Sequence, residues 1–123
     1  MYRKLDAMGS TILMETVEQG STQGSMPGGD FVGADTALIV DEMGMVRIAY
    51  QNATEGSLRY ARRQPNGTWT LITLKGDEDP YEGSFGFYVD QVLTPGMATP
   101  MVSSYRYWLS QPYSNGLIVT PAP

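Results

Sequence analysis

The stretch from Asp35 to Lys75 is the feature that most constrains the fold, because four short strand-like segments follow one another with a turn signal between them. Each intervening stretch contains a glycine, and the last of them reads Gln64-Pro65-Asn66-Gly67. Short segments of this kind separated by tight turns are typical of antiparallel strands. The stretch therefore predicts one four-stranded antiparallel sheet. Its predicted strands are Thr36–Asp41, Val46–Tyr50, Ser57–Arg62 and Thr68–Leu74.

The segments on either side of this sheet read as parts of further sheets. Two strands are predicted before it, at Met1–Leu5 and Ile12–Val17, although a helix over residues 11–18 is an alternative for the second. Three strands are predicted after it, at Phe85–Asp90, Met101–Trp108 and Asn115–Thr120. Phe85–Asp90 repeats Thr36–Asp41 about 49 positions later, since both end in Val-Asp, and such a period is typical of repeated sheets.

Composition excludes several classes of function. The chain has 123 residues, 41% apolar and 17% charged, which suits one small folded domain. Its net charge is −5 with only 8 Lys and Arg, so nucleic acid is not an expected partner. It has no Cys and no His, which excludes a thiol nucleophile, thiolate and imidazole metal ligands and a histidine general base. No apolar run reaches the length of a membrane span, and we expect no cofactor.

The densest aromatic cluster is the candidate ligand-binding site. Aromatic faces beside an arginine suit sugar or peptide binding, whereas the alternative is that the rings fill space between neighbouring sheets. Alternation along Met101–Trp108 predicts that Tyr105 and Tyr107 face one way and that Val102 and Ser104 face the other. The cluster consists of Tyr105, Arg106, Tyr107, Trp108 and Tyr113.

Two groups of carboxylates were considered for chemistry, and neither predicts a catalytic residue. Asp77, Glu78 and Asp79 could gather oxygen ligands for Ca²⁺, but their spacing fits no EF-hand loop, and an acidic solvated turn is the simpler interpretation. Asp41 and Asp90 recur at similar strand ends. They could be paired for glycoside chemistry, but recurrence from sheet to sheet favours a role in capping turns.

A set of residues spread over the central sheet matches a known repeat in order. They are Val40-Asp41, Gly44, Ile48-Ala49-Tyr50, Asn52-Ala53-Thr54, Gly56, Leu58-Arg59-Tyr60-Ala61 and Gly67-Thr68-Trp69-Thr70. This pattern resembles the blades of a family of bacterial β-propellers, which read His-Ile-Ser-Tyr-Tyr-Asp-Ala-Thr-Asn-Gly-Asp-Leu-Lys-Tyr-Ala before a Gly-Trp-Thr strand. The sequence departs from the family at Val46-Arg47, where the family has Pro-His.

The resemblance implies an all-β fold with four-stranded antiparallel sheets in β-propeller blade order, forming an incomplete propeller. The chain is then a single partial propeller domain, and a compact two-sheet β-sandwich is the alternative. Its expected parts are the end of one blade at 1–17, a Gly-rich loop at 18–34, a complete blade at 35–75, an acidic loop at 76–84 and the first three strands of the next blade at 85–120.

The expected function is a non-catalytic binding or scaffolding module within a larger exported bacterial protein or assembly. The motif consists of turn and strand residues, and members of the family are commonly exported, which implies an extracellular or periplasmic location. The alternatives are a carboxylate-based carbohydrate-active enzyme on a propeller and a virion or surface-assembly component. The expected partners are other blades of a longer chain or other protein subunits, with carbohydrate as a further candidate.

The central sheet is apolar on both faces, since Ala37 and Ile39 alternate with Leu38 and Val40. A sheet of this kind must be covered on both faces. We therefore expect other blades or subunits to complete the fold, and the 123 residues alone to aggregate, oligomerise or stay molten. The residues expected to be mostly buried are Leu38, Val40, Ile48 and Tyr50.

Overall fold

The fold is all-β and antiparallel. The computed structural model describes residues 1–20, 30–76, 83–108 and 115–123, and these contain nine strands and no helix. Residues 11–15 form a strand, so the strand prediction for this segment is confirmed and the helical alternative is wrong. The strands are β1 (Tyr2–Leu5), β2 (Thr11–Glu15), β3 (Val32–Val40), β4 (Val46–Asn52), β5 (Ser57–Arg63), β6 (Trp69–Lys75), β7 (Gly83–Val92), β8 (Met101–Trp108) and β9 (Gly116–Pro121).

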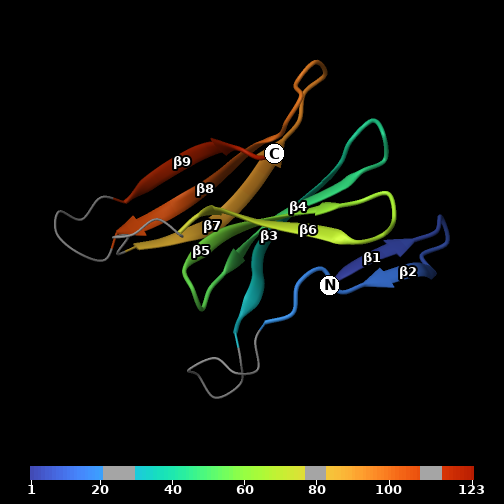
Figure 1. The fold of residues 1–123 in the computed structure, drawn as a ribbon, viewed down its shortest axis with the longest axis horizontal. Coiled ribbons are helices and arrows are strands. Elements are labelled where there is room, and N and C mark those ends of the chain that lie inside the picture. The colour runs from blue at the N-terminus through green and yellow to red at the C-terminus, as the bar shows by residue number, and fades with distance from the viewer. Residues whose placement is uncertain (21–29, 77–82, 109–114) are drawn as a thin grey trace.

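The strands form three sheets in the order in which they follow one another along the chain. β1 and β2 form a hairpin, β3 to β6 form a four-stranded sheet, and β7 to β9 form a three-stranded sheet. Figure 1 shows the four-stranded sheet lying between the hairpin at the N-terminus and the three-stranded sheet at the C-terminus. The predicted antiparallel four-stranded central sheet is confirmed.

The same tight turn closes three of the hairpins. Asp6 begins the β1–β2 turn and Asp41 the β3–β4 turn, and the Oδ1 of each accepts hydrogen bonds from the backbone N–H groups two and four residues later. Gly9 and Gly44 follow with φ of 84° and 76°, a region that glycine reaches without a Cβ clash. In both turns the N–H of the first residue donates to the carbonyl oxygen four residues later, and its own carbonyl oxygen accepts from the glycine three residues later. Residues 64–68, between β5 and β6, make the same two backbone hydrogen bonds. These glycine-bulge turns hold each hairpin in register.

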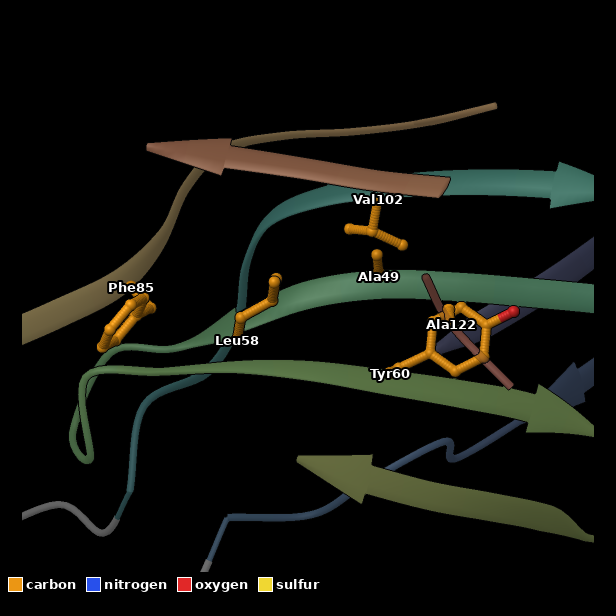
Figure 2. Packing of buried hydrophobic residues seen from close by; sticks show 6 residues of the cluster. All are labelled: Ala49, Leu58, Tyr60, Phe85, Val102 and Ala122. Atoms are coloured by element: carbon orange, nitrogen blue, oxygen red, sulfur yellow. The ribbon is translucent and has the colours of Figure 1, made fainter. Parts of the chain in front are cut away.

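One face of the four-stranded sheet, here called the second face, packs against the three-stranded sheet. It presents Ala49, Leu58 and Tyr60, which are buried together with Phe85 of β7 and Val102 of β8. Figure 2 shows Val102 and Ala49 pointing toward one another across the space between the two sheets. This apolar contact joins the two sheets into one unit, because burying apolar surface contributes about 25 cal/mol per Å².

The opposite face of the four-stranded sheet, here called the first face, packs against the β1–β2 hairpin. It presents Ile48 and Tyr50 of β4, which are buried, and Trp69 of β6. Tyr2 of β1 meets Trp69 edge to face, with ring centroids 5.5 Å apart. The four-stranded sheet is therefore a middle layer, as its apolar residues on both faces require.

The cover over the first face is incomplete. Ile48 and Tyr50 are 8% and 3% exposed, as expected, but Leu38 and Val40 on the same face are 50% and 58% exposed, so the expected burial of those two is wrong. The hairpin contacts β5 and β6 through Glu15 and Tyr2, and Glu18 in the segment after it bonds to Tyr50 of β4. β3 lies beyond these contacts, and its first face is left open.

β7 of the three-stranded sheet and β3 of the four-stranded sheet share a backbone irregularity. A register shift interrupts β3 between Ala34 and Ala37, and another interrupts β7 between Phe87 and Asp90. Asp90 therefore lies inside β7 rather than in a turn, so the predicted match of its segment to Thr36–Asp41 is out of register. Residues that pair across neighbouring strands form rows, and the rows next to these register shifts correspond between the two sheets. The row Ala34–Gln51–Leu58 corresponds to Phe87–Tyr105–Leu117, and the row Ala37–Ala49–Tyr60 corresponds to Asp90–Ser103–Val119.

The equivalent pair Leu58 and Leu117 gives a matched test of this core. Leu58 is fully buried and Leu117 is 70% exposed. We expect Leu58→Ala to lower the free energy of unfolding by about 2–5 kcal/mol, because it leaves a cavity between the sheets. Leu117→Ala, measured in dilute solution, should cost less than about 1 kcal/mol. Urea unfolding followed by tryptophan fluorescence measures both, and equal losses would contradict the assignment of the core to the second face.

Candidate functional site

The structure divides the predicted aromatic cluster between two faces of the three-stranded sheet. Alternation along β8 places Tyr105 and Tyr107 on the face that points away from the four-stranded sheet, while Val102 on the opposite face is fully buried. Arg106 lies on the same face as Val102, with its guanidinium carbon 5.8 Å from the centre of the Trp108 ring. The five residues therefore do not form one binding surface, and Tyr113 lies outside the described residues.

Tyr105 and Tyr107 instead form an aromatic surface with Phe87 and Tyr88 of β7. The rings of Phe87 and Tyr107 have centroids 4.9 Å apart and are perpendicular, and Tyr105 and Tyr107 are also 4.9 Å apart. Tyr88 meets Tyr105 edge to face at 6.4 Å. The sequence analysis missed the two β7 residues, although placing Phe87 opposite Tyr105 on the neighbouring strand would have identified one of them.

Tyr88 is held in a strained backbone conformation at the edge of this surface. Its φ is 53°, a left-handed value that a bulky residue rarely adopts, and its side chain is 73% exposed. Its N–H donates to Oδ2 of Asp35 on β3 at 3.2 Å, and Asp35 also has a positive φ of 45°. This hydrogen bond links the edge strands of the two larger sheets and holds the Tyr88 ring toward solvent.

The polar groups of the aromatic surface are tyrosine hydroxyl groups. Partial burial raises the pKa of Tyr107, and the nearby hydroxyl groups of Tyr88 and Tyr105 raise it further. A phenol with a raised pKa stays protonated at neutral pH and is neither a nucleophile nor a base. Tyr107 can therefore offer its ring face and a protonated hydroxyl group to a partner.

A second candidate site is a cavity of about 250 Å³ on the first face of the four-stranded sheet, which Glu18 and Tyr50 line. The Tyr50 hydroxyl donates a short hydrogen bond to Glu18, and Arg59 forms an ion pair with Glu18 at 2.7 Å. Burial raises the pKa of Tyr50 well above its usual range, and the hydrogen bond to Glu18 adds to this. Glu18 is therefore held as a paired carboxylate.

Glu15, the last residue of β2, forms a similar contact. It pairs with Arg63 at 2.6 Å and accepts a hydrogen bond from the Trp69 indole at 3.1 Å. The hydrogen bond from Arg63 lowers the pKa of Glu15. The two carboxylates thus attach the N-terminal segment to the four-stranded sheet through arginines.

A third candidate site is a cavity of about 510 Å³ between the β3–β4 turn and residues 93–98, with Asp41 and Arg47 in its wall. Arg47 pairs with Asp41 at 3.2 Å. Burial alone would raise the pKa of Asp41, but hydrogen bonds from the Met45 N–H and from Arg47 outweigh burial, and the pKa is lowered. Asp41 caps its turn, as predicted, and remains charged.

The remaining predicted positions are the three neighbouring carboxylates of the acidic loop. Asp77, Glu78 and Asp79 lie outside the described residues. Within the described ranges, no three side chains of metal-ligating type come together, and no helix is long and apolar enough to cross a membrane. Comparison with protein-family models, curated proteins and solved structures finds no match to the chain.

Asp41 and Asp6 provide a matched test of the ion pair, because both cap the same type of turn but only Asp41 pairs with an arginine. A carboxylate with a lowered pKa adds stability above the pKa of the unfolded state and loses it as the pH falls through the folded-state pKa. We expect Asp41→Asn to flatten the fall in unfolding free energy between about pH 5 and pH 2, and to cost roughly 1 kcal/mol at pH 7.

The same substitution at Asp6 is the control for the loss of a turn-capping carboxylate, because Asp6 accepts the same two backbone hydrogen bonds in its own turn. Denaturant unfolding at a series of pH values measures these effects. A pH profile that is unchanged by Asp41→Asn would show that the Arg47 pair contributes no stability.

Proposed function

We propose that the chain is a non-catalytic binding or scaffolding module with the architecture of part of a β-propeller. The observation that supports this most directly is the stacking of three successive sheets, in which the middle sheet is covered on each face by a neighbour of the same chain. By its resemblance to exported bacterial propellers, the chain is proposed to function outside the cytoplasm, within a larger protein or assembly.

The repeat between the two larger sheets supports the propeller architecture. β3 and β7 each begin their sheet, each contain a register shift, and each contain a glycine and then a residue with positive φ two positions later. Gln91 of β7 donates from Nε2 to the carbonyl oxygens of Ala37 and Arg47, at 2.6 Å and 3.1 Å. First strands that repeat one another and lie side by side are what a radial array of blades requires.

The described carboxylates support binding rather than catalysis. Glu15, Glu18 and Asp41 each form an ion pair with an arginine. Glu18 lines the smaller of the two cavities described above, and Asp41 and Arg47 line the other. A glycosidase needs one carboxylic acid whose raised pKa keeps it protonated, next to a second carboxylate. The ion pair at Asp41 lowers that pKa and so works against an acid role.

The alternative, a carboxylate-based carbohydrate-active enzyme, is favoured by one observation only. Glu18 and the Tyr50 hydroxyl, joined by a hydrogen bond, line a cavity. An enzyme of this kind would need Glu18 for turnover, whereas a binding module would need it only to hold Arg59 and the N-terminal segment in place.

Substitution of Glu18 distinguishes the two functions. We expect the unmodified chain to release no nitrophenol from a panel of nitrophenyl glycosides, and Glu18→Gln to lower the unfolding free energy by about 1–3 kcal/mol by leaving Arg59 unpaired. Glu42→Gln, at an exposed position, is the matched control and should leave stability within about 0.5 kcal/mol. Glycoside hydrolysis that is lost in Glu18→Gln but kept in Glu42→Gln would overturn the proposed function.

A further inference from the structure

We propose that the uncovered face of the three-stranded sheet docks onto the first face of β3 in a second copy of this chain. The proposal rests on the stacked architecture proposed above and names its partner. Two surfaces take part. The outer face is formed by Phe87, Tyr105, Leu117 and Val119 of the three-stranded sheet, and the β3 face is formed by Leu38 and Val40.

The outer face is apolar and open to solvent. Leu117 and Val119 of β9 are 70% and 58% exposed, and they lie next to the half-buried rings of Phe87 and Tyr105. Large apolar side chains gathered on one exposed face mark a site of interaction. These four side chains are neighbours across β7, β8 and β9, so a single partner could bury them together.

The internal repeat shows what kind of surface fits there. Leu117 and Val119 occupy the row positions that Leu58 and Tyr60 occupy in the four-stranded sheet. Leu58 and Tyr60 are fully buried because the three-stranded sheet covers them. The outer face thus corresponds in its sheet positions to a face that is covered by a β-sheet, and a leucine stands at the same position, Leu58 or Leu117, in both.

The β3 face supplies the matching half of that contact. In the internal interface, the row Gln91–Val102 of the three-stranded sheet presses onto the second face, with both residues buried. The equivalent row of the four-stranded sheet is Leu38–Ile48, and Leu38 is 50% exposed because the hairpin does not reach it. One chain therefore presents both halves of a single interface, one half on each side of the stack.

A second copy fits these surfaces better than a sugar does. Sugar sites combine ring faces with polar groups that fix orientation. Here the neighbours of the rings along β9 are Leu117 and Val119, and the rings pack edge to face on one another. The contact joins two different surfaces, so it is head to tail and extends into a ring or a filament.

The test uses one substitution on each surface. Sedimentation equilibrium over a range of concentrations should show reversible self-association of the unmodified chain. Leu117→Lys and Leu38→Lys should each weaken it at least about tenfold, because each places a charge in an apolar contact. Met43→Lys, at an 88% exposed position in the β3–β4 turn, is the matched control and should associate like the unmodified chain.

Mixing the two variants gives the decisive measurement. Each variant keeps the surface that the other lacks, so an equimolar mixture should form a one-to-one dimer that grows no further. An unmodified chain that is monomeric at every concentration would overturn the proposal, as would a mixture that stays monomeric. A fluorescence change with soluble oligosaccharides that Leu117→Lys abolishes would assign the outer face to sugar instead. None of these outcomes overturns the proposed function, which fails only on Glu18-dependent hydrolysis.

Discussion

The structure depends on one constraint, which is that the four-stranded sheet is apolar on both faces and must exclude water from both. Most of its second face is covered by the three-stranded sheet, and part of its first face is covered by the β1–β2 hairpin. A single hairpin or a lone sheet of this kind would be marginally stable in water, because one of its faces would remain wet. The stacking of sheets is therefore a condition of folding rather than an arrangement of finished domains.

Polar side chains fix how the layers sit on one another. On the second face, the amides of Gln51 and Gln91 donate to backbone carbonyl oxygens across the interface, including that of Phe85 at 2.8 Å. On the first face, ion pairs of Glu15 and Glu18 with arginines attach the hairpin and the segment after it. Apolar contact alone allows sheets to slide over one another, whereas these directed bonds form at only one relative position of the layers.

The sequence predicted elements better than it predicted exposure. Turns such as Asp41–Met45 and alternation such as that of Met101–Trp108 are local, and the strands they predict are present in the structure. The exposure of Leu38 could not be predicted, because it depends on how far a hairpin more than 20 residues earlier reaches across the sheet. The sequence identified Tyr105 and Tyr107 of the aromatic surface but not Phe87, because Phe87 pairs with Tyr105 between two register shifts in β7.

The residues that differ between the equivalent rows predict that the proposed contact on the outer face is weaker than the contact between the two sheets of one chain. On the second face, Ala37 and Ala49 are small and apolar and let the three-stranded sheet approach closely. Their equivalents on the outer face are Asp90 and Ser103, and Asp90 is exposed. A carboxylate and a hydroxyl lose hydration when they are covered, which offsets part of the gain from Leu117 and its neighbours. An outer face that carries both apolar and polar side chains is suited to reversible binding, because its polar side chains are hydrated when the partner is absent.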